Sequence, residues 1–121
     1  MKSLIIENDA KLKEIIDKID AEITENMEKT FDIVLEFLNK LYTIISEKKP
    51  IYETYPLFEV MNEEIHLIWK KDYHKSVVKV SSNFGNNILY NIFIRNIHKK
   101  GFFTLDMIDE KHEFIKSIID M

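Results

Sequence analysis

The chain has 121 residues, 45% of them hydrophobic and 31% charged, with a formal net charge of −4. These values are typical of one folded domain with its own hydrophobic core rather than of a disordered chain. It contains no cysteine, which excludes disulfides, thiolate nucleophiles and cysteine-ligated metals. No stretch approaches the ~18 apolar residues of a membrane span. We therefore expect a single cytoplasmic domain over residues 1–121, with no membrane partner.

The first segment, residues 1–49, is predicted to be helical. Neither glycine nor proline occurs from Asn8 to Lys49, and apolar residues recur every three or four positions, as on one face of a helix. The apolar positions are Leu12, Ile16, Ile19, Ile23, Met27, Phe31, Val34, Leu38, Leu41 and Ile45. The pattern is thin across residues 20–30, where Thr30 is a candidate N-cap. One long helix or two helices fit; a pair is favoured because a forty-residue helix would project beyond ~30 Å, the diameter of a small domain.

After Pro50 the period of the apolar residues changes to two, which indicates strands. Leu57–Met61 is a possible short first strand, and residues 65–70 and 75–80 form a hairpin through a four-residue loop, 71–74. This register sets Leu67 opposite Val78, and a turn at 83–85, with Gly85 left-handed, then sets Val78 opposite Tyr90. The pattern predicts a three- to four-stranded antiparallel meander over residues 57–97.

The last segment, residues 104–120, is predicted to be a helix capped by Thr104 or Asp106. Helices, an antiparallel meander and a further helix make an α+β fold with two layers. We expect the helices to cover one face of the sheet and to leave the other face exposed.

The charge is uneven along the chain. Residues 65–100 carry seven Lys or Arg and only one acidic residue, a net charge of +6, whereas the rest of the chain is acidic. The alternation sends Trp69 inward and predicts a basic outer face that could bind a partner. Its candidate partner-binding residues are His66, Ile68, Lys70, Lys75, Val77, Lys79, Phe93 and Arg95. Such a face either keeps the sheet soluble or meets an anionic partner.

The predicted helices carry a second charged surface, of opposite sign. Its candidate residues are Glu14, Asp17, Glu25, Glu28, Asp32 and Glu36. An acidic helix surface is either solvated and stabilised by pairs with nearby lysines or able to engage a basic protein.

Residues that would carry chemistry are sparse. Gly85 and Gly101 are the only glycines, so the glycine-rich loops that bind phosphates or dinucleotides are excluded. Residues 112–116, HEFIK, begin like a zinc-protease motif, but Lys116 stands where the second histidine ligand is required. The few serines have no evident histidine partner. The sequence therefore predicts no catalytic, cofactor or metal site.

Small size, segregated charge and no catalytic motif favour a non-catalytic protein-binding domain. The leading hypothesis is an inhibitor, immunity protein, antitoxin or phage-encoded anti-defence protein that occludes a partner protein. One alternative is a homodimer or other homo-oligomer paired through the N-terminal helices, where Ile33, Phe37, Tyr42 and Ile44 widen the apolar stripe. The other is nucleic-acid binding by the basic sheet face, which would weaken steeply with salt.

Overall fold

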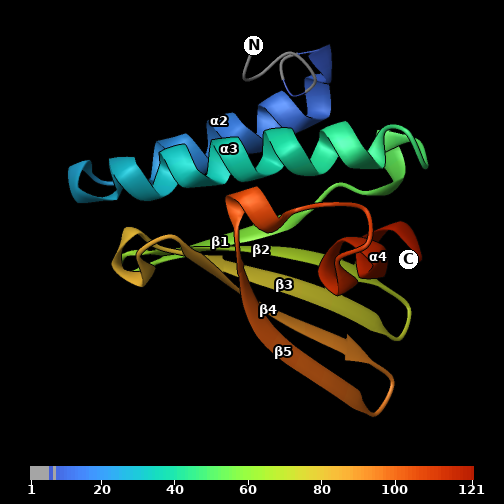
Figure 1. Ribbon diagram of the computed structural model, residues 1–121. Helices are drawn as coiled ribbons and strands as arrows, with labels where there is room; N and C mark the ends of the chain where they lie inside the picture. Colours follow the sequence, from blue (N-terminus) through green and yellow to red (C-terminus); the bar gives the residue numbers. More distant parts are fainter. Residues whose placement is uncertain (1–5, 7) are drawn as a thin grey trace.

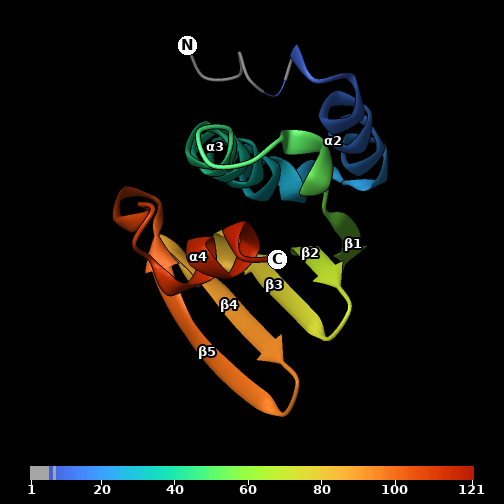
Figure 2. The same cartoon turned by 90° about the vertical axis from the view of Figure 1, so that its right-hand side faces the viewer.

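A computed structural model describes residues 6 and 8–121 (Figure 1). Its α-helices in this part of the chain are α2 (Ala10–Glu22), α3 (Glu28–Ile45) and α4 (Glu113–Ile119). Its strands are β1 (Leu57–Met61), β2 (Glu64–Lys71), β3 (His74–Val80), β4 (Asn87–Ile94) and β5 (Ile97–Thr104). The strands form one antiparallel sheet in the order β1-β2-β3-β4-β5. All three helices lie on the same side of the sheet (Figure 2), so the predicted α+β fold with two layers is confirmed.

The N-terminal helical segment forms two helices rather than one long helix, which is the alternative that the sequence favours. Asp9 caps α2, because its carboxylate accepts hydrogen bonds from the backbone N–H groups of Lys11 and Leu12 at 3.1 and 3.0 Å. A 3₁₀ turn, η1 (Glu25–Met27), leads directly into α3. The predicted N-cap at Thr30 is therefore wrong, and the Thr30 hydroxyl instead accepts a hydrogen bond from the backbone N–H of Ser82 at 2.9 Å.

The predicted strand register is confirmed, since Leu67 pairs with Val78 and Val78 with Tyr90. The four-residue loop at 71–74 is wrong, because Lys71 pairs with His74 and only two residues form the turn. The predicted turn at 83–85 is part of a longer connection between Val80 and Asn87 that contains the 3₁₀ turn η3 (Ser82–Phe84). Gly85 has the left-handed φ expected of it, +67°.

The sheet has a fifth strand, which corrects the predicted three to four strands and the predicted end at residue 97. Glycine weakens the interior of a strand but can permit a close approach by another group, and it does so here. A Cβ on Gly101 would lie 2.7 Å from the hydroxyl of Tyr90, the residue paired with it on β4. Tyr90 in turn donates a hydrogen bond to the Glu113 carboxylate at the start of α4. The glycine that looked like the end of the sheet thus accommodates a tyrosine that binds the last helix.

The C-terminal helix begins at Glu113, not at residue 104. The chain from Thr104 first makes a 3₁₀ turn, η4 (Leu105–Met107), and then an irregular segment. The predicted caps Thr104 and Asp106 are therefore wrong. The cap is His112, whose ring Nδ1 accepts a hydrogen bond from the backbone N–H of Phe114 at 3.1 Å, a role that propensity tables do not assign to histidine.

The core lies between the helices and the inner face of the sheet, and its centre is aromatic. Phe37 of α3 contacts Trp69, Phe103 and Phe114 with ring centroids 5.9–6.4 Å apart, a range favourable for aromatic pairs. Trp69 is 1% exposed, so its predicted inward orientation is confirmed. This packing fills the space between the helices and the inner face of the sheet and leaves the other face to solvent.

Candidate functional site

The outer face of the sheet gathers most of the residues that the sequence singled out. Direct cross-strand pairs on this face join His66 to Lys79, Ile68 to Val77, and Lys70 to Lys75, with Phe93 opposite Lys75 on the next strand. We call these seven residues, His66, Ile68, Lys70, Lys75, Val77, Lys79 and Phe93, the basic sheet face. None of the three described helices covers it (Figure 2).

Strand β5 adds residues to this face that the sequence reasoning missed. His98 lies opposite Phe93, Lys100 opposite Asn91, and Phe102 opposite Leu89. Their alternation, every second residue from 98 to 102, was the available signal, but Gly101 and the two lysines before it resembled a loop. The true face is therefore wider and carries one more lysine and one more exposed aromatic ring.

A shallow groove of about 320 Å³ crosses the middle of the basic sheet face. Ile68 and Val77 form its apolar part, and Val77 is only 9% exposed although no helix covers it. The remaining lining residues are Glu59, His66, Lys75, Lys79, Asn91 and Phe93. An apolar floor between charged walls suits a side chain that is apolar along its length, with a carboxylate nearby.

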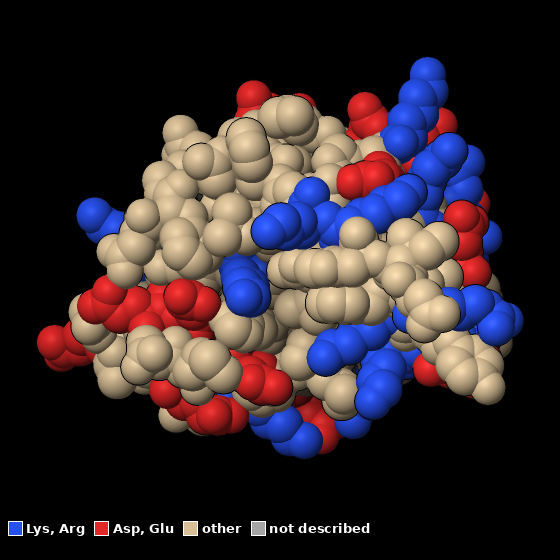
Figure 3. Space-filling view, turned by 90° about the horizontal axis from the view of Figure 1, so that it is seen from below, with Lys and Arg blue, Asp and Glu red and all other residues tan. Residues whose placement is uncertain are grey.

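Charge is distributed asymmetrically around the groove. Figure 3 views this face from below and shows lysine and arginine side chains across its middle, with acidic side chains gathered toward its margins. His66 is engaged by a neighbouring carboxylate, since its Nε2 lies 2.7 Å from Glu64 Oε1. The lysines are therefore the groups most available to an anionic partner.

Aromatic side chains occupy one side of the face. The rings of Phe93 and His98 stack with centroids 4.3 Å apart and planes 10° apart. His98 Nε2 also lies 2.8 Å from the Asn91 side-chain oxygen. Phe102 is 61% exposed and stacks on no aromatic ring of residues 6 and 8–121. One ring is thus covered by its neighbour and another is open to solvent.

Arg95 does not belong to the basic sheet face, which corrects its predicted position on the last strand. It lies in the turn between β4 and β5 with a φ of +54°. Its guanidinium sits 5.0 Å from the ring centroid of Tyr73, in the turn between β2 and β3, a cation–π geometry. Arg95 therefore joins two turns at one end of the sheet.

The same end of the sheet contains a buried serine–histidine network that the sequence did not indicate. His74 Nε2 lies 3.1 Å from Ser76 Oγ, and Ser76 Oγ lies 2.9 Å from Ser117 Oγ of α4. The histidine neighbour of Ser76, which was not evident in the sequence, lies two positions away on the same strand, where side chains share a face. Ser76 is fully buried, so its hydroxyl is enclosed and the network serves to join β3 to α4.

His74 is the titratable member of this network. Burial lowers the pKa of His74 below its usual 6.5, and the negative charge of Asp120 partly opposes that shift. A hollow of about 430 Å³ opens beside them. Its charged lining residues are Lys71, Asp72, Arg95 and Asp120, which carry as many negative as positive charges.

The predicted acidic helix surface divides into separate parts. Glu14 lies between two lysines, 3.1 Å from Lys18 Nζ and 3.6 Å from Lys11 Nζ, and the hydrogen bond from Lys18 is the main cause that lowers its pKa. A hollow of about 440 Å³ at the junction of the two helices is lined by Asp20, Ile23, Thr24, Glu25, Glu28, Phe31 and Asp32. Asp17 and Glu36 are exposed outside it.

The described residues contain neither a metal-binding cluster nor a membrane-spanning helix. No group of three or more His, Asp or Glu side chains in residues 6 and 8–121 is arranged to hold a metal ion. Over the same residues, no helix combines the length and the apolar character needed to cross a membrane. Comparison of the chain with protein-family models, with curated proteins and with solved structures finds no match.

Proposed function

We propose that this protein is a non-catalytic binding domain that docks its basic sheet face on an acidic surface of a partner protein. The observation that carries the proposal is the apolar groove at Ile68 and Val77, which stays uncovered and is bordered by lysines. Binding would occlude the partner protein, as an inhibitor, an immunity protein, an antitoxin or a phage-encoded anti-defence protein does. The cytoplasmic location is part of the proposal.

The arrangement of this face agrees with the anatomy of protein interfaces. Such interfaces have an apolar centre that excludes water and a polar rim. Ile68 and Val77 would supply the centre, and Lys70, Lys75 and Lys79 the rim. Rim charges of this kind mainly raise the association rate and select against wrong partners. The rest of the molecule is acidic, so the lysines would also orient the protein as it approaches.

Nucleic-acid binding by the same face is the second candidate, and one observation favours it. Phe102 is exposed beside Lys100 and Leu89, and exposed aromatic rings with nearby lysines can stack on bases. Two observations weigh against it: His98 already covers the ring of Phe93, and the net charge of −4 repels a phosphate backbone. We therefore favour an acidic protein as the partner.

The burial of the helical apolar residues weighs against the homo-oligomer alternative. Phe37 and Tyr42, which were expected to widen an intermolecular stripe, are fully buried inside the domain. Ile33 and Ile44 are partly buried against the same core. The N-terminal helices use their apolar stripe to cover the sheet of their own chain.

A charge-reversal experiment tests the proposal. The tagged protein is incubated with native extract of the source cells, and captured proteins are quantified by mass spectrometry. Lys75→Glu/Lys79→Glu changes the basic sheet face, whereas Lys13→Glu/Lys29→Glu makes the same charge change on exposed positions of α2 and α3. We expect a protein partner that the first variant loses and the second retains, with capture that weakens as salt is raised.

Two results would contradict the proposal. One is a set of captured proteins that the sheet-face variant and the helix variant retain equally. The other is tight, salt-sensitive binding of a single-stranded oligonucleotide that the sheet-face variant alone loses, which would establish the second candidate instead.

A further inference from the structure

The two edges of the sheet are protected very differently. An edge strand exposes unpaired backbone groups that can pair with another chain, and lysines on the edge discourage this. Strand β5 carries Lys99 and Lys100, and Lys99 also lies 3.9 Å from Glu113. Strand β1 reads Leu-Phe-Glu-Val-Met and has one charge and no lysine or proline. Its Leu57 is 62% exposed and its Met61 41% exposed, so β1 is the open edge.

The hairpin geometry identifies which backbone groups of β1 do not pair with β2. Met61 pairs with Glu64 across a two-residue turn, and the residues that close such a turn are hydrogen-bonded to each other. Hydrogen-bonded and non-hydrogen-bonded pairs then alternate along an antiparallel ladder. The N–H and C=O groups of Phe58 and Val60, whose partners on β2 are Leu67 and Ile65, consequently point away from the sheet.

A groove of about 460 Å³ lies along this edge, between β1 and α2. Its apolar lining residues are Ile15, Tyr55, Pro56, Leu57, Phe58 and Ile68, and its charged ones are Lys11, Lys18 and Glu59. It is therefore lined from the helix, from the strand and from the outer face of the sheet. An extended peptide alternates its side chains between two sides, and both sides here offer apolar contacts.

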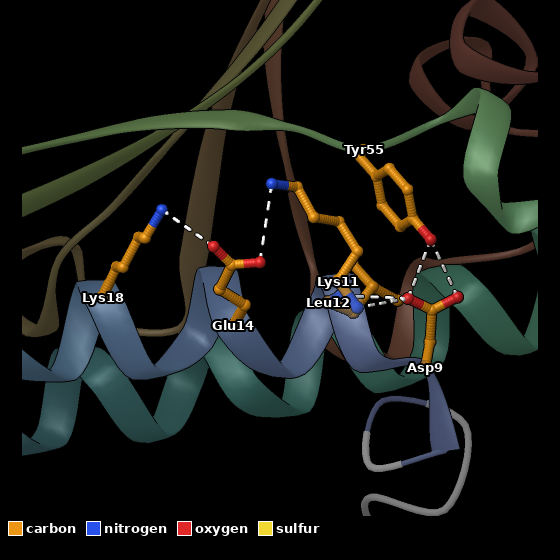
Figure 4. A network of polar contacts seen from close by, with 6 residues as sticks. All are labelled: Asp9, Lys11, Leu12, Glu14, Lys18 and Tyr55. Carbon is orange, nitrogen blue, oxygen red and sulfur yellow. Dashed lines mark hydrogen bonds and ion pairs between the residues drawn. The ribbon is translucent and has the colours of Figure 1, made fainter.

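The helix side of the groove is held in position by polar contacts (Figure 4). In that view the Lys11 and Lys18 side chains rise from α2, with Glu14 between them. The Glu14 carboxylate lies 3.6 Å from Lys11 Nζ and 3.1 Å from Lys18 Nζ. Together these three side chains carry a net positive charge. At the N-cap of α2, Tyr55 Oη donates to the Asp9 carboxylate at 2.9 Å, which ties the chain entering β1 to the start of the helix.

We propose that an extended segment of a partner protein adds to β1 as a sixth strand. Its backbone pairs with the outward groups of Phe58 and Val60, its apolar side chains contact Ile15 and Leu57, and a carboxylate on it reaches Lys11 or Lys18. Main-chain hydrogen bonds supply affinity in this mode of recognition, while the flanking pockets supply specificity. The site adjoins the basic sheet face, with which it shares Ile68, but it does not depend on the lysines there.

A second copy of the chain is a poorer occupant. Antiparallel pairing of β1 with its copy, centred on the middle of the strand, would place two Glu59 carboxylates opposite each other. Like charges directly opposite on neighbouring strands are destabilising. A hetero-partner with an apolar or cationic residue at that position avoids this repulsion.

Selection from a random-peptide phage library, with the folded protein as bait, tests the proposal. We expect enriched peptides that alternate apolar residues and include a carboxylate. Their affinity should fall about tenfold or more for Leu57→Glu, because an apolar anchor is lost and the carboxylate is repelled. Ile97→Glu is the matched control: it adds the same charge at an aliphatic residue of similar exposure, 60% against 62%, on the opposite edge strand, and should bind as the wild type does.

Amide hydrogen exchange on the wild-type protein provides a readout that does not depend on a variant. The amides of Phe58 and Val60 should exchange faster than those of Leu57 and Glu59 in the free protein and become protected when a selected peptide binds. The proposal is overturned by the absence of any enriched peptide, by equal binding of Leu57→Glu and wild type, or by protection confined to other strands. Concentration-dependent dimerisation that protects Phe58 and Val60 would assign the edge to a second copy instead. Loss of binding in Lys75→Glu/Lys79→Glu but not in Leu57→Glu would move the peptide to the basic sheet face.

Discussion

The indole Nε1 of Trp69 donates a hydrogen bond of 2.8 Å to the backbone carbonyl of Thr54. The hydroxyl of Tyr42 donates to the same oxygen. One buried acceptor thus joins β2, α3 and the connection that precedes β1. Burial is also the main cause that raises the pKa of Tyr42 far above its usual value, so this hydroxyl remains a donor throughout the physiological range.

The shared acceptor predicts strong coupling between its two donors. Tyr42→Phe and Trp69→Phe each leave the Thr54 oxygen with one donor, whereas the double variant leaves a buried acceptor with none. We expect the double variant to lose about 1–3 kcal/mol more free energy of unfolding than the two single losses together. Urea denaturation followed by circular dichroism measures this, and Tyr73→Phe, at an exposed ring, should change stability by less than about 0.5 kcal/mol. Strict additivity would show that the three groups do not act together.

The contact between Thr30 and Ser82 predicts that Thr30 stabilises the connection between β3 and β4. Thr30→Val keeps the shape of the side chain but removes the acceptor for the Ser82 N–H, so we expect a loss of about 1 kcal/mol in the free energy of unfolding. Thr30→Ser retains the hydroxyl and should lose less than Thr30→Val. In thermal denaturation, equal losses for both variants would mean that the methyl group, rather than the hydrogen bond, is what matters.

The strand pairing could be predicted because two independent signals agreed. The alternation of Ile65, Leu67 and Trp69 set the buried face, and the predicted turns, although wrong in length, kept the same register, so Leu67 faced Val78. The residues of the basic sheet face could be predicted from this alternation alone. The groove on this face could not be predicted, because its floor depends on how deeply neighbouring strands bury Val77.

The parts that sequence reasoning missed depend on contacts between distant segments. Strand β5 passes through Gly101, which resembles a break until the ring of Tyr90 is placed against it. Helix α4 begins late because its cap is the His112 ring, and the buried link between Ser76 and Ser117 joins residues 41 positions apart. No local propensity encodes such contacts.

The two glycines should respond to alanine substitution for different physical reasons. Gly101→Ala places a Cβ 2.7 Å from the Tyr90 hydroxyl, which displaces the ring and weakens its hydrogen bond to Glu113. We expect a loss of about 1–3 kcal/mol in the free energy of unfolding, together with faster amide exchange in α4. Gly85→Ala meets no atom within 4 Å but holds a φ of +67°, so it should lose about 1 kcal/mol through backbone strain without an effect on α4. Unchanged exchange in α4 of Gly101→Ala would contradict this link.

The network at His74 predicts that stability depends on pH. Because burial lowers the pKa of His74 in the folded protein below its usual 6.5, the unfolded chain binds the proton more readily. The contribution of His74 to stability is therefore fully present above about pH 6.5 and is lost progressively as the pH falls through 6.5 toward the folded pKa. Urea denaturation at a series of pH values measures this loss.

Two variants isolate the contribution of His74 from other charges. His74→Gln removes the titrating group, so the decline just below pH 6.5 should become flatter than in the wild type. Asp120→Asn removes the negative charge that opposes the shift, so the folded pKa should fall further and the decline should extend to lower pH. Lys71, Asp72 and Arg95 also line the hollow beside His74, and both variants leave these three groups in place. If His74→Gln and the wild type lose stability in parallel between pH 6.5 and 5, the decline comes from another group and the protonation of His74 does not loosen the contact between β3 and α4.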